Sequence, residues 1–290
     1  MFKIYDLNYK EVSLPVDDLG YGMKTPKNIG LDVEIGPVIY ENIYSQSSYA
    51  DKLVKRYPKD RTVNLIVSVI SYHESDVDWR LKRDRVYAFF RNLGVFYVAE
   101  AEQPYKLLKV TIDADYNYDQ LNQDWARAEI PLKIIDTPFK QSLHTTLDID
   151  SEGIRWNDKW GYGMGLSSDK CEWKYSFDTD AGQSYDFKFL NAGTEAVKLI
   201  QQKESRIRVE FKLAGSWFEI SDGTTTFRLN KSYVKGDVLV IRGSKIFFNG
   251  QSVLQDTNRN FLTVKQGMNT WQTRGPKYYD FSIDFRFLYD

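Results

Sequence analysis

Few residues in this sequence have the types and spacing that catalysis or metal binding requires. Asp113 and Asp115, and further along Asp148, Asp150 and Glu152, place carboxylates at alternate positions. On a β-strand, alternate side chains lie on one face. In paired carboxylates there, one pKa can be raised and the other lowered, as acid–base catalysis requires. The same pair can also supply oxygen ligands to Ca²⁺. A solvated strand face is the more common interpretation, because carboxylates are mostly exposed.

The other residue types that carry chemistry are scarce. His73 and His144 are the only histidines and Cys171 is the only cysteine, and their spacing matches no set of metal ligands. The sequence contains no Gly-x-Ser-x-Gly motif, phosphate-binding loop or cysteine–histidine arrangement. We therefore expect a protein that is not an enzyme and that holds no metal or cofactor.

A loop rich in aromatic and glycine residues is the most unusual stretch of the chain. Trp156, Trp160 and Tyr162 lie close to Asn157 and Asp158. Aromatic faces beneath a sugar ring, with amide and carboxylate groups on its hydroxyls, would form a glycan-binding platform. Packing of the aromatic rings over the open end of a β-sandwich, or within a protein interface, explains the same residues. All three interpretations stay open at this stage.

Composition limits the class of protein. The chain has 290 residues, a formal net charge of −1 and a pI of about 6.2, so two domains are expected and no basic footprint for nucleic acid is present. A single cysteine excludes an intrachain disulfide and favours a reducing compartment. The N-terminal residues do not resemble a signal peptide, and no apolar run approaches a membrane span. We expect neither membrane insertion nor recognition of a nucleic-acid sequence.

One amphipathic helix is predicted over residues 78–94. Its apolar positions recur with helical spacing at Trp79, Val86, Phe89, Phe90 and Leu93. The opposite face carries charged residues that are predicted to be solvated, and these are Arg80, Lys82, Asp84, Arg85 and Arg91. Strand-like segments flank the helix on both sides, so we expect it to cover one face of a sheet.

The first 140 residues are predicted to form an α+β domain around this helix. Residues 17–60, rich in Gly, Tyr and Ser, favour a long extended arm or hairpin. Alternation from Val63 to Val69 predicts a strand with one buried face. A hairpin is expected around residues 102–104, and another strand over residues 125–135. Pro131 within that strand indicates an edge or a bulge.

A second domain is predicted over residues 150–290, after a polar stretch that ends at Gly153. Asp222-Gly223 and Asn249-Gly250 are typical of two-residue hairpin turns in which both central residues have positive φ. One-sided strands with frequent turns favour an antiparallel β-sandwich. The last strand, over residues 279–288, belongs either to this sandwich or to the N-terminal sheet. The fold class predicted for the whole chain is mainly β.

Several short motifs, in order along nearly the whole chain, resemble the distal tail proteins of phages with long non-contractile tails. Those in the first domain are Lys82-Arg83-Asp84, Phe96-Tyr97-Val98, Pro104-Tyr105-Lys106, Val110 and the exit Ile134-Ile135-Asp136-Thr137-Pro138-Phe139. Those in the second are Val234-Lys235-Gly236-Asp237, Ile246-Phe247-Phe248-Asn249-Gly250, Gly267-Met268-Asn269 and Phe285-Arg286-Phe287-Leu288-Tyr289. The second group is similar to the galectin-like sandwich of that family.

The resemblance implies a structural hub at the tip of a phage tail, built in the host cytoplasm and carried in the virion. In that family the N-terminal domains close a homohexameric ring, which joins the tail tube protein to tail-tip and receptor-binding proteins. Two alternatives remain. One is a carbohydrate-binding module that contacts host glycans through the C-terminal sandwich, and the other is a hydrolase that uses Asp113 or Asp148.

Overall fold

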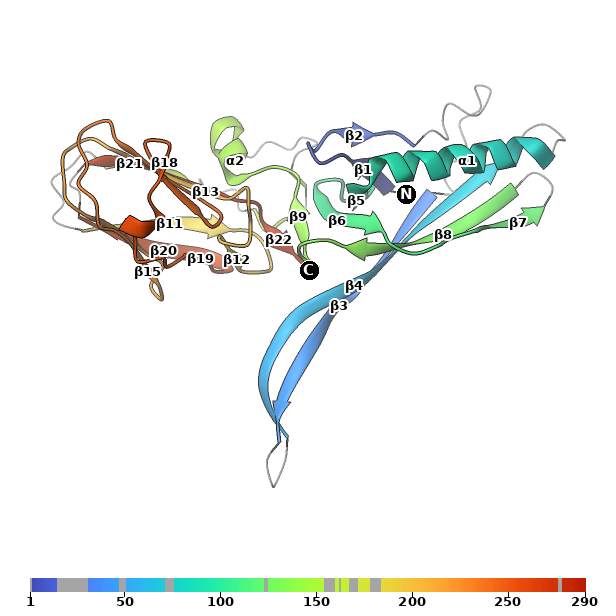
Figure 1. The fold of residues 1–290 in the computed structure, drawn as a ribbon, viewed down its shortest axis with the longest axis horizontal. Coiled ribbons are helices and arrows are strands. Elements are labelled where there is room, and N and C mark those ends of the chain that lie inside the picture. The colour runs from blue at the N-terminus through green and yellow to red at the C-terminus, as the bar shows by residue number, and fades with distance from the viewer. Residues whose placement is uncertain are drawn as a thin grey trace. The chain divides into compact units, whose positions relative to one another are not determined.

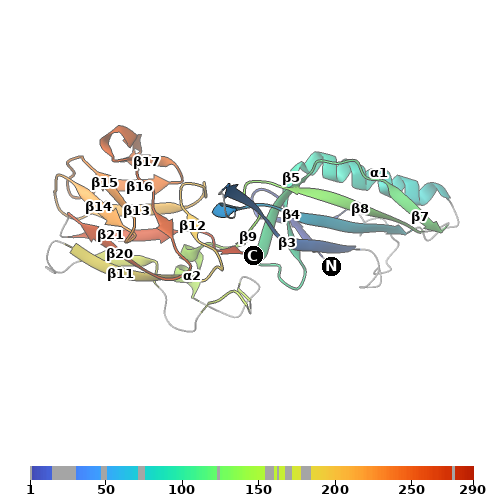
Figure 2. The ribbon, with the colours of Figure 1, turned by 90° about the horizontal axis from the view of Figure 1, so that it is seen from below.

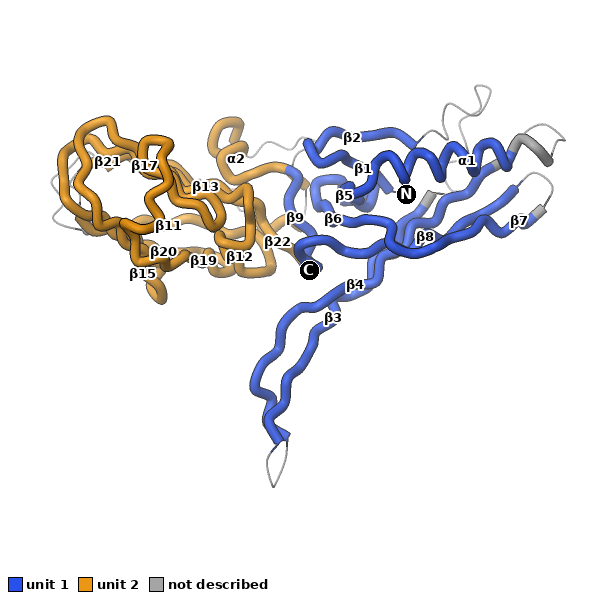
Figure 3. Tube along the Cα trace, viewed as in Figure 1, with its two compact units in different colours: residues 1–143, 290 blue, residues 144–289 orange. Residues whose placement is uncertain are grey.

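The computed structural model describes residues 2–14, 31–46, 51–70, 76–122, 125–153, 160–161, 163–166, 172–177, 184–275 and 278–290. The chain forms two compact units. Unit 1 comprises residues 1–143 together with Asp290, and unit 2 comprises residues 144–289 (Figure 3). Within the described residues, no helix is both long and apolar enough to cross a membrane.

Unit 1 is an antiparallel sheet with one long helix. Its strands are β1 (Phe2–Tyr5), β2 (Glu11–Val12), β3 (Leu31–Ser45), β4 (Lys52–Ile70), β5 (Val95–Glu100), β6 (Lys106–Ile112), β7 (Tyr118–Asn122), β8 (Trp125–Ile134) and β9 (Lys140–Ser142). They pair in the order β2-β1-β5-β6-β8-β4-β3, while β7 also pairs with β8 and β9 with β6. The predicted hairpin around residues 102–104 is confirmed as β5 and β6.

The predicted helix is confirmed as α1 (Asp76–Leu93), which lies along one face of this sheet (Figures 1 and 2). Val86 and Phe90 are buried, and Phe89 and Leu93 are half-buried against the same core. Gly94 ends the helix with φ of 64°, a conformation that glycine adopts without strain. The prediction for Lys82 was wrong, because this side chain is buried at 5% exposure.

The sheet face below the helix comes from strands with strict alternation. Val63, Leu65 and Val67 on β4 are at most 1% exposed, and they lie opposite apolar residues of β8. Pro131 is not at a sheet edge, since β8 pairs with β4 on one side and with β6 and β7 on the other. On that second side, however, the pairing with β6 ends at Leu132 and the pairing with β7 begins at Ala128. On this side Pro131 therefore lies between the residues paired with β6 and those paired with β7, a place in the sheet that tolerates a residue without an N–H.

Unit 2 is an antiparallel β-sandwich. Its elements are α2 (Thr146–Glu152), β10 (Lys174–Phe177), β11 (Ser184–Asn191), β12 (Val197–Lys198), β13 (Arg206–Phe211), β14 (Phe218–Ser221), β15 (Thr226–Leu229), β16 (Val238–Arg242), β17 (Lys245–Phe248), β18 (Gln251–Ser252), a 3₁₀ turn at Leu254–Asp256, β19 (Thr263–Val264), β20 (Gly267–Arg274), β21 (Tyr279–Asp284) and β22 (Leu288–Tyr289). One sheet has the order β10-β21-β13-β16-β17-β18 and the other β11-β20-β14-β15. β21 thus lies inside the unit 2 sheet, between β10 and β13.

Aromatic rings fill the space between these two sheets. Phe187 on β11 meets Phe281 on β21 with ring centroids 4.5 Å apart, and Phe211 on β13 meets Phe218 on β14 at 5.4 Å. All four rings are at most 3% exposed. The aromatic residues of the alternating strands therefore form the core of the sandwich, as the sequence pattern predicted. The predicted fold class, mainly β, is confirmed.

One local prediction in unit 2 needs correction. Asn249 and Gly250 both have positive φ, as predicted, but of the pair Asp222-Gly223 only Gly223 does. There the strands pair at Ser221 and Thr226, so the loop has four residues rather than two, and Asp222 Oδ1 accepts backbone N–H bonds from inside it. The polar stretch before Gly153, which was expected to be the domain boundary, contains α2.

Candidate assembly interface

Strands β3 and β4 continue past the sheet of unit 1 as a two-stranded arm (Figure 1). The β3–β4 ladder runs from Leu31 opposite Val67 to Ser45 opposite Lys52. Only the inner half of β4, from Val63 to Ile70, also pairs with β8. From Lys52 to Thr62, β4 is hydrogen-bonded on one side alone. Residues 31–46 and 51–60 thus lie in a hairpin within the predicted 17–60 arm, while residues 17–30 and 47–50 lie outside the described part of the chain.

Three register shifts interrupt the ladder of the arm. They fall between Ile35 and Val38, between Ile39 and Tyr40, and between Ile43 and Tyr44. Such bulges bend the strand and increase its twist, which explains why the arm curves as it leaves the sheet (Figure 1). The sequence cause of the first bulge is visible at Gly36-Pro37, because proline cannot donate to the ladder.

The arm exposes a set of large apolar side chains. Ile39, Ile43, Tyr44, Leu53 and Val54 are between 44% and 62% exposed. Tyr44 and Leu53 lie directly opposite each other in the ladder. An isolated two-stranded hairpin is marginally stable in water, and clustered exposed apolar residues indicate an interaction surface. The arm therefore has the composition of a segment that is covered in an assembly.

Charged residues of the arm pair with each other across the ladder. Lys59 Nζ lies 2.9 Å from Glu41 Oε2, and the guanidinium of Arg56 lies 4.1 Å from the ring centroid of Tyr40. Hydrogen bonds from Lys59, and next from Tyr57, hold the pKa of Glu41 below its ordinary value. The same bond from Lys59 to Glu41 raises the pKa of Lys59. These fully exposed pairs set the register of the arm and contribute little to stability.

The backbone edges of the arm are open. β3 is the end strand of its sheet in the described part of the chain, and β2 at the opposite end has only two residues. An end strand presents unpaired N–H and C=O groups that can pair with a strand of another chain. Because β3 spans 15 residues, this edge is long enough to bind a neighbouring strand.

An ion pair between a buried guanidinium and an exposed carboxylate lies where the arm leaves the sheet. Arg61, opposite Val38 in the ladder, is 5% exposed, and its Nη2 lies 2.5 Å from Oδ1 of Asp290. Burial lowers the pKa of the Arg61 guanidinium, while the charge of Asp290 opposes that shift. Nε and Nη1 of Arg61 are buried without a hydrogen-bond partner in the described residues. Asp290 is thus its contacting carboxylate among the described residues, and the charge of Glu100 supports it at longer range. Sequence reasoning missed this pair, which joins residues 229 positions apart.

The residues predicted to contact glycans do not form an exposed platform where they are described. Trp160 is 3% exposed, and its ring lies 5.9 Å from that of His144 and 6.2 Å from that of Phe287. Its Nε1 is buried without a partner among the described residues. Sugar stacking requires an accessible ring face, which Trp160 lacks. Trp156 and Tyr162 lie outside the described residues.

The carboxylates considered for catalysis are engaged in separate structural contacts. Asp148 accepts the backbone N–H of Thr145 at 2.8 Å at the start of α2, and Asp150 lies 3.2 Å from Lys174 Nζ. Asp148, Asp150 and Glu152 lie on this helix and not on a strand, so alternate positions do not share a face. Asp113 lies 2.6 Å from Lys133 Nζ. Within the described residues, no group of three or more potential ligands is placed to hold a metal ion. His73 and Cys171 lie outside these residues.

The fold comprises an α+β unit with a projecting β-hairpin and an antiparallel two-sheet sandwich. The crystal structure of the SPP1 Dit (gp 19.1) protein, described as a paradigm of the hub adsorption apparatus in phages that infect Gram-positive bacteria, matches with a TM-score of 0.63. The match covers 99% of this chain and 100% of that one at 11% sequence identity, so it establishes a shared fold.

Two structures of the phage p2 baseplate in its activated conformation, with Ca and with Sr, match at 12% identity over 98% of this chain and 97% of theirs. Their TM-scores of 0.38 and 0.39 are too low to establish a common fold. No protein-family model and no curated protein sequence matches the chain.

Proposed function

We propose that this protein is the structural hub at the distal end of a phage tail. In this proposal, residues 1–140 form the ring-forming domain and residues 150–290 form a galectin-like sandwich that projects outward. The protein joins the tail tube protein to tail-tip and receptor-binding proteins in the virion, after assembly in the host cytoplasm. It acts by binding and not by catalysis.

The observation that carries this proposal is the arm formed by β3 and β4. Its backbone edges are open, and its apolar side chains are exposed. A chain with the fold of a tail hub thus carries a long segment that gains stability only when another surface covers it. A neighbouring copy of the same chain provides such a surface without any additional partner.

A closed homohexameric ring is the assembly that we propose. A ring requires a heterologous interface, in which one patch of each subunit meets a different patch of the next, and the rotation must close. The arm supplies one patch, and the sheet of unit 1 supplies the other. Strand pairing at the open edge of β3 would fix the register between subunits, while Ile43 and Leu53 would bury apolar area.

The alternative function, a carbohydrate-binding module that uses the aromatic loop, has less support. Trp160 is buried in the unit 2 core, so of the three aromatic residues only Trp156 and Tyr162 remain candidates for sugar contacts. A hydrolase based on Asp113 or Asp148 also has less support, because each of these carboxylates has a structural partner.

Light scattering coupled to gel filtration tests the ring. We expect the full-length protein to have the mass of a homohexamer and to show closed rings in negative-stain images. The double variant Ile43→Lys/Leu53→Lys should be folded and monomeric, because each lysine places a charge where the neighbouring copy buries apolar surface. Both positions are already exposed, so the monomer should keep its secondary structure.

A matched control is the variant Val234→Lys/Met268→Lys, which introduces the same charges at exposed apolar positions of unit 2. This control should assemble like the wild type. A full-length protein that remains monomeric, or an arm variant that assembles as well as the control, would contradict the proposed ring.

A further inference from the structure

The outer face of the six-stranded sheet in unit 2 carries an unusual row of like charges. Arg206 on β13 lies directly opposite Arg242 on β16, and Arg242 lies directly opposite Lys245 on β17. All three side chains are exposed. The neighbouring positions Ile207, Ile241 and Ile246 point to the other face and are buried. Three adjacent strands, about 4.8 Å apart, thus present three cations in a line.

This row is unfavourable in the free protein. Like charges directly opposite each other on neighbouring strands destabilise a sheet. In the part of the chain that the structure describes, none of the three cations has a hydrogen-bond or ion-pair partner. The carboxylate opposite Arg206, that of Asp284, accepts instead from Leu147 N at 3.1 Å and from Thr146 Oγ1 at 3.3 Å. The charge of the row is therefore not neutralised by ion pairing within the described residues.

A fourth cation lies near the same end of the sheet. The turn between β16 and β17 contains Gly243, which has φ of 55°. A Cβ atom on Gly243 would lie 3.3 Å from the Cα of Lys203, so the chain around Lys203 packs closely on this turn. Lys203 is itself exposed. The backbone of this fourth basic residue therefore lies against the turn that joins Arg242 to Lys245.

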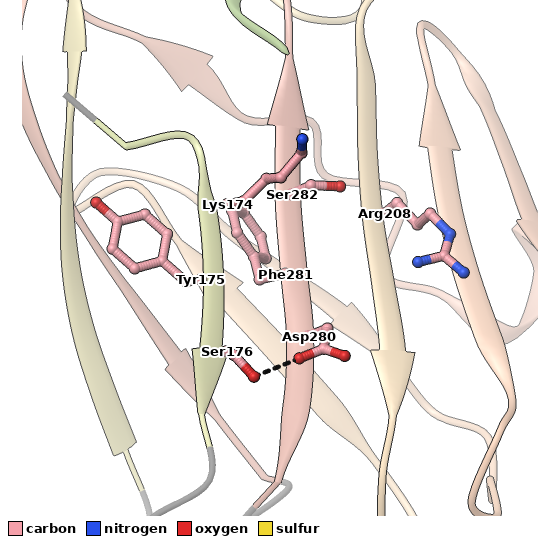
Figure 4. Close-up of a pocket in the computed structure, with 7 residues that line it drawn as sticks. All are labelled: Lys174, Tyr175, Ser176, Arg208, Asp280, Phe281 and Ser282. Atoms are coloured by element: carbon pink, nitrogen blue, oxygen red, sulfur yellow. Dashed lines mark hydrogen bonds between the residues drawn. The ribbon is translucent and has the colours of Figure 1, made fainter. Parts of the chain in front are cut away.

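The next row on the same face contains a hollow of about 340 Å³ (Figure 4). Lys174 and Arg208 lie on either side of Ser282, each directly opposite it in the ladders of β10 and β13 with β21. The short serine between two long cations leaves the space open. Below it, Ser176 Oγ donates to Asp280 Oδ1 at 2.6 Å. Both cations already have ion-pair partners, Lys174 with Asp150 and Arg208 with Glu210. Asp280 is itself paired with Lys212 Nζ at 2.7 Å. The hollow therefore offers hydroxyl groups and a carboxylate acceptor among neutralised charges, and the excess positive charge of this face lies in the row of Arg206, Arg242 and Lys245.

We propose that this face binds an anionic glycan, whose carboxylate or phosphate groups contact the row Arg206–Arg242–Lys245 and whose sugar hydroxyls occupy the hollow at Ser176, Asp280 and Ser282. Arginine binds such oxyanions with two parallel hydrogen bonds. The carboxylate of Asp280 accepts hydrogen bonds from hydroxyl groups.

The mixed character of the face selects this class of ligand over other polyanions. Nucleic acid would bring its phosphates close to Asp280 and Glu210, and its binding usually relies on a basic footprint that a chain of net charge −1 lacks. An acidic polypeptide supplies carboxylates but no array of hydroxyl donors for the hollow. A glycan with spaced charges supplies both kinds of group, anionic groups for the row Arg206–Arg242–Lys245 and hydroxyl groups for the hollow. This inference does not depend on the ring, because it concerns a surface of unit 2 alone.

Fluorescence anisotropy with the full-length protein and labelled polymers at physiological ionic strength tests the inference. The probes are polygalacturonate, which carries carboxylates, and phosphomannan, which carries phosphates, and the stronger of the two identifies the anionic group. Neutral dextran, poly(dT) and poly-glutamate are the comparison polymers. We expect binding of at least one anionic glycan and weaker binding of all three comparison polymers.

The variant Arg206→Gln/Arg242→Gln/Lys245→Gln should lower affinity for the glycan by about tenfold or more. Its melting temperature should be unchanged or higher, because opposed like charges have been removed. The control Lys188→Gln/Lys235→Gln/Arg274→Gln removes the same charge from exposed positions outside both rows and should bind normally. Equal binding of poly(dT) or poly-glutamate, equal losses in both variants, or no glycan binding by the wild type would overturn the inference, whatever the oligomeric state.

Discussion

Strand β4 lies in two environments along its length. From Val63 to Ile70 it is hydrogen-bonded on both sides, and Leu65, Val67 and Val69 are fully buried beneath α1. From Lys52 to Thr62 it pairs with β3 alone, and Leu53 and Val54 are 48% and 62% exposed. The inner half is stabilised by its own core. The outer half, with similar apolar residues, has no described surface to cover them.

The difference shows that apolar residues about ten positions apart on one strand can have different roles. In the inner half, burial of an apolar side chain contributes to the stability of the single chain. In the outer half, an equivalent side chain contributes only after another surface covers it. Substitutions in the inner half should therefore lower the stability of the single chain, while substitutions in the outer half should affect only its assembly.

The largest effect on folding is expected at the inner half. Leu65→Ala should lower the free energy of unfolding by about 2–5 kcal/mol, because it removes a fully buried side chain and leaves a cavity. The matched change in the outer half, Leu53→Ala, should stay within about 0.5 kcal/mol in the monomer. Urea denaturation followed by circular dichroism measures both values. Equal losses at the two positions would mean that the arm is packed in the single chain.

A smaller effect is expected at the junction of the two halves. Asp290→Ala should cost about 1–3 kcal/mol, because the buried guanidinium of Arg61 loses its carboxylate. Arg61→Met removes the buried charge as well and should cost less than Asp290→Ala. Urea denaturation followed by circular dichroism shows which of the two variants loses more free energy of unfolding. If Arg61→Met is the more damaging change, the guanidinium has a partner that stabilises it more strongly than Asp290 does.

The smallest effect is expected in the outer half, at the pair of Glu41 and Lys59. Because the pKa of Glu41 is lowered in the fold, this pair stabilises the arm above the unfolded pKa of about 4.3, and that contribution is lost as the pH falls through the folded value. An NMR titration of the Glu41 carboxyl should give a pKa below the ordinary value. In Lys59→Gln the pKa should rise toward it. An unchanged pKa in the variant would show that the pair does not form in solution.

Sequence patterns predicted the elements whose side chains alternate or recur against a core. The helix stripe at Val86 and Phe90, the buried face of Val63 to Val69 and the aromatic strands of the sandwich were all visible in this way. Elements were missed where side-chain hydrogen bonds to nearby backbone groups determine the local structure, because such bonds leave no periodic pattern in the sequence. Asp222 caps its own loop with side-chain hydrogen bonds, and α2 begins where Asp148 accepts the N–H of Thr145. That threonine-to-acid spacing was the available signal for α2.

The candidate interface was less predictable than the fold. Composition indicated an arm, but its exposed apolar set, its bulges and the Arg61–Asp290 pair depend on which strand lies opposite which residue. The row Arg206–Arg242–Lys245 is equally hidden in sequence, because the register of three strands aligns it. Burial of Lys82 also depends on contacts that helical periodicity cannot reveal.

The three bulges of the arm have a consequence for the protein before it assembles. A flat edge strand with exposed apolar residues can stack with identical strands without limit and form fibrils. Each bulge interrupts the ladder and twists the edge, so a second copy cannot extend a regular cross-β stack along the whole strand. The irregular backbone therefore opposes regular stacking of free arms, and in the proposed ring pairing would require an edge of complementary curvature.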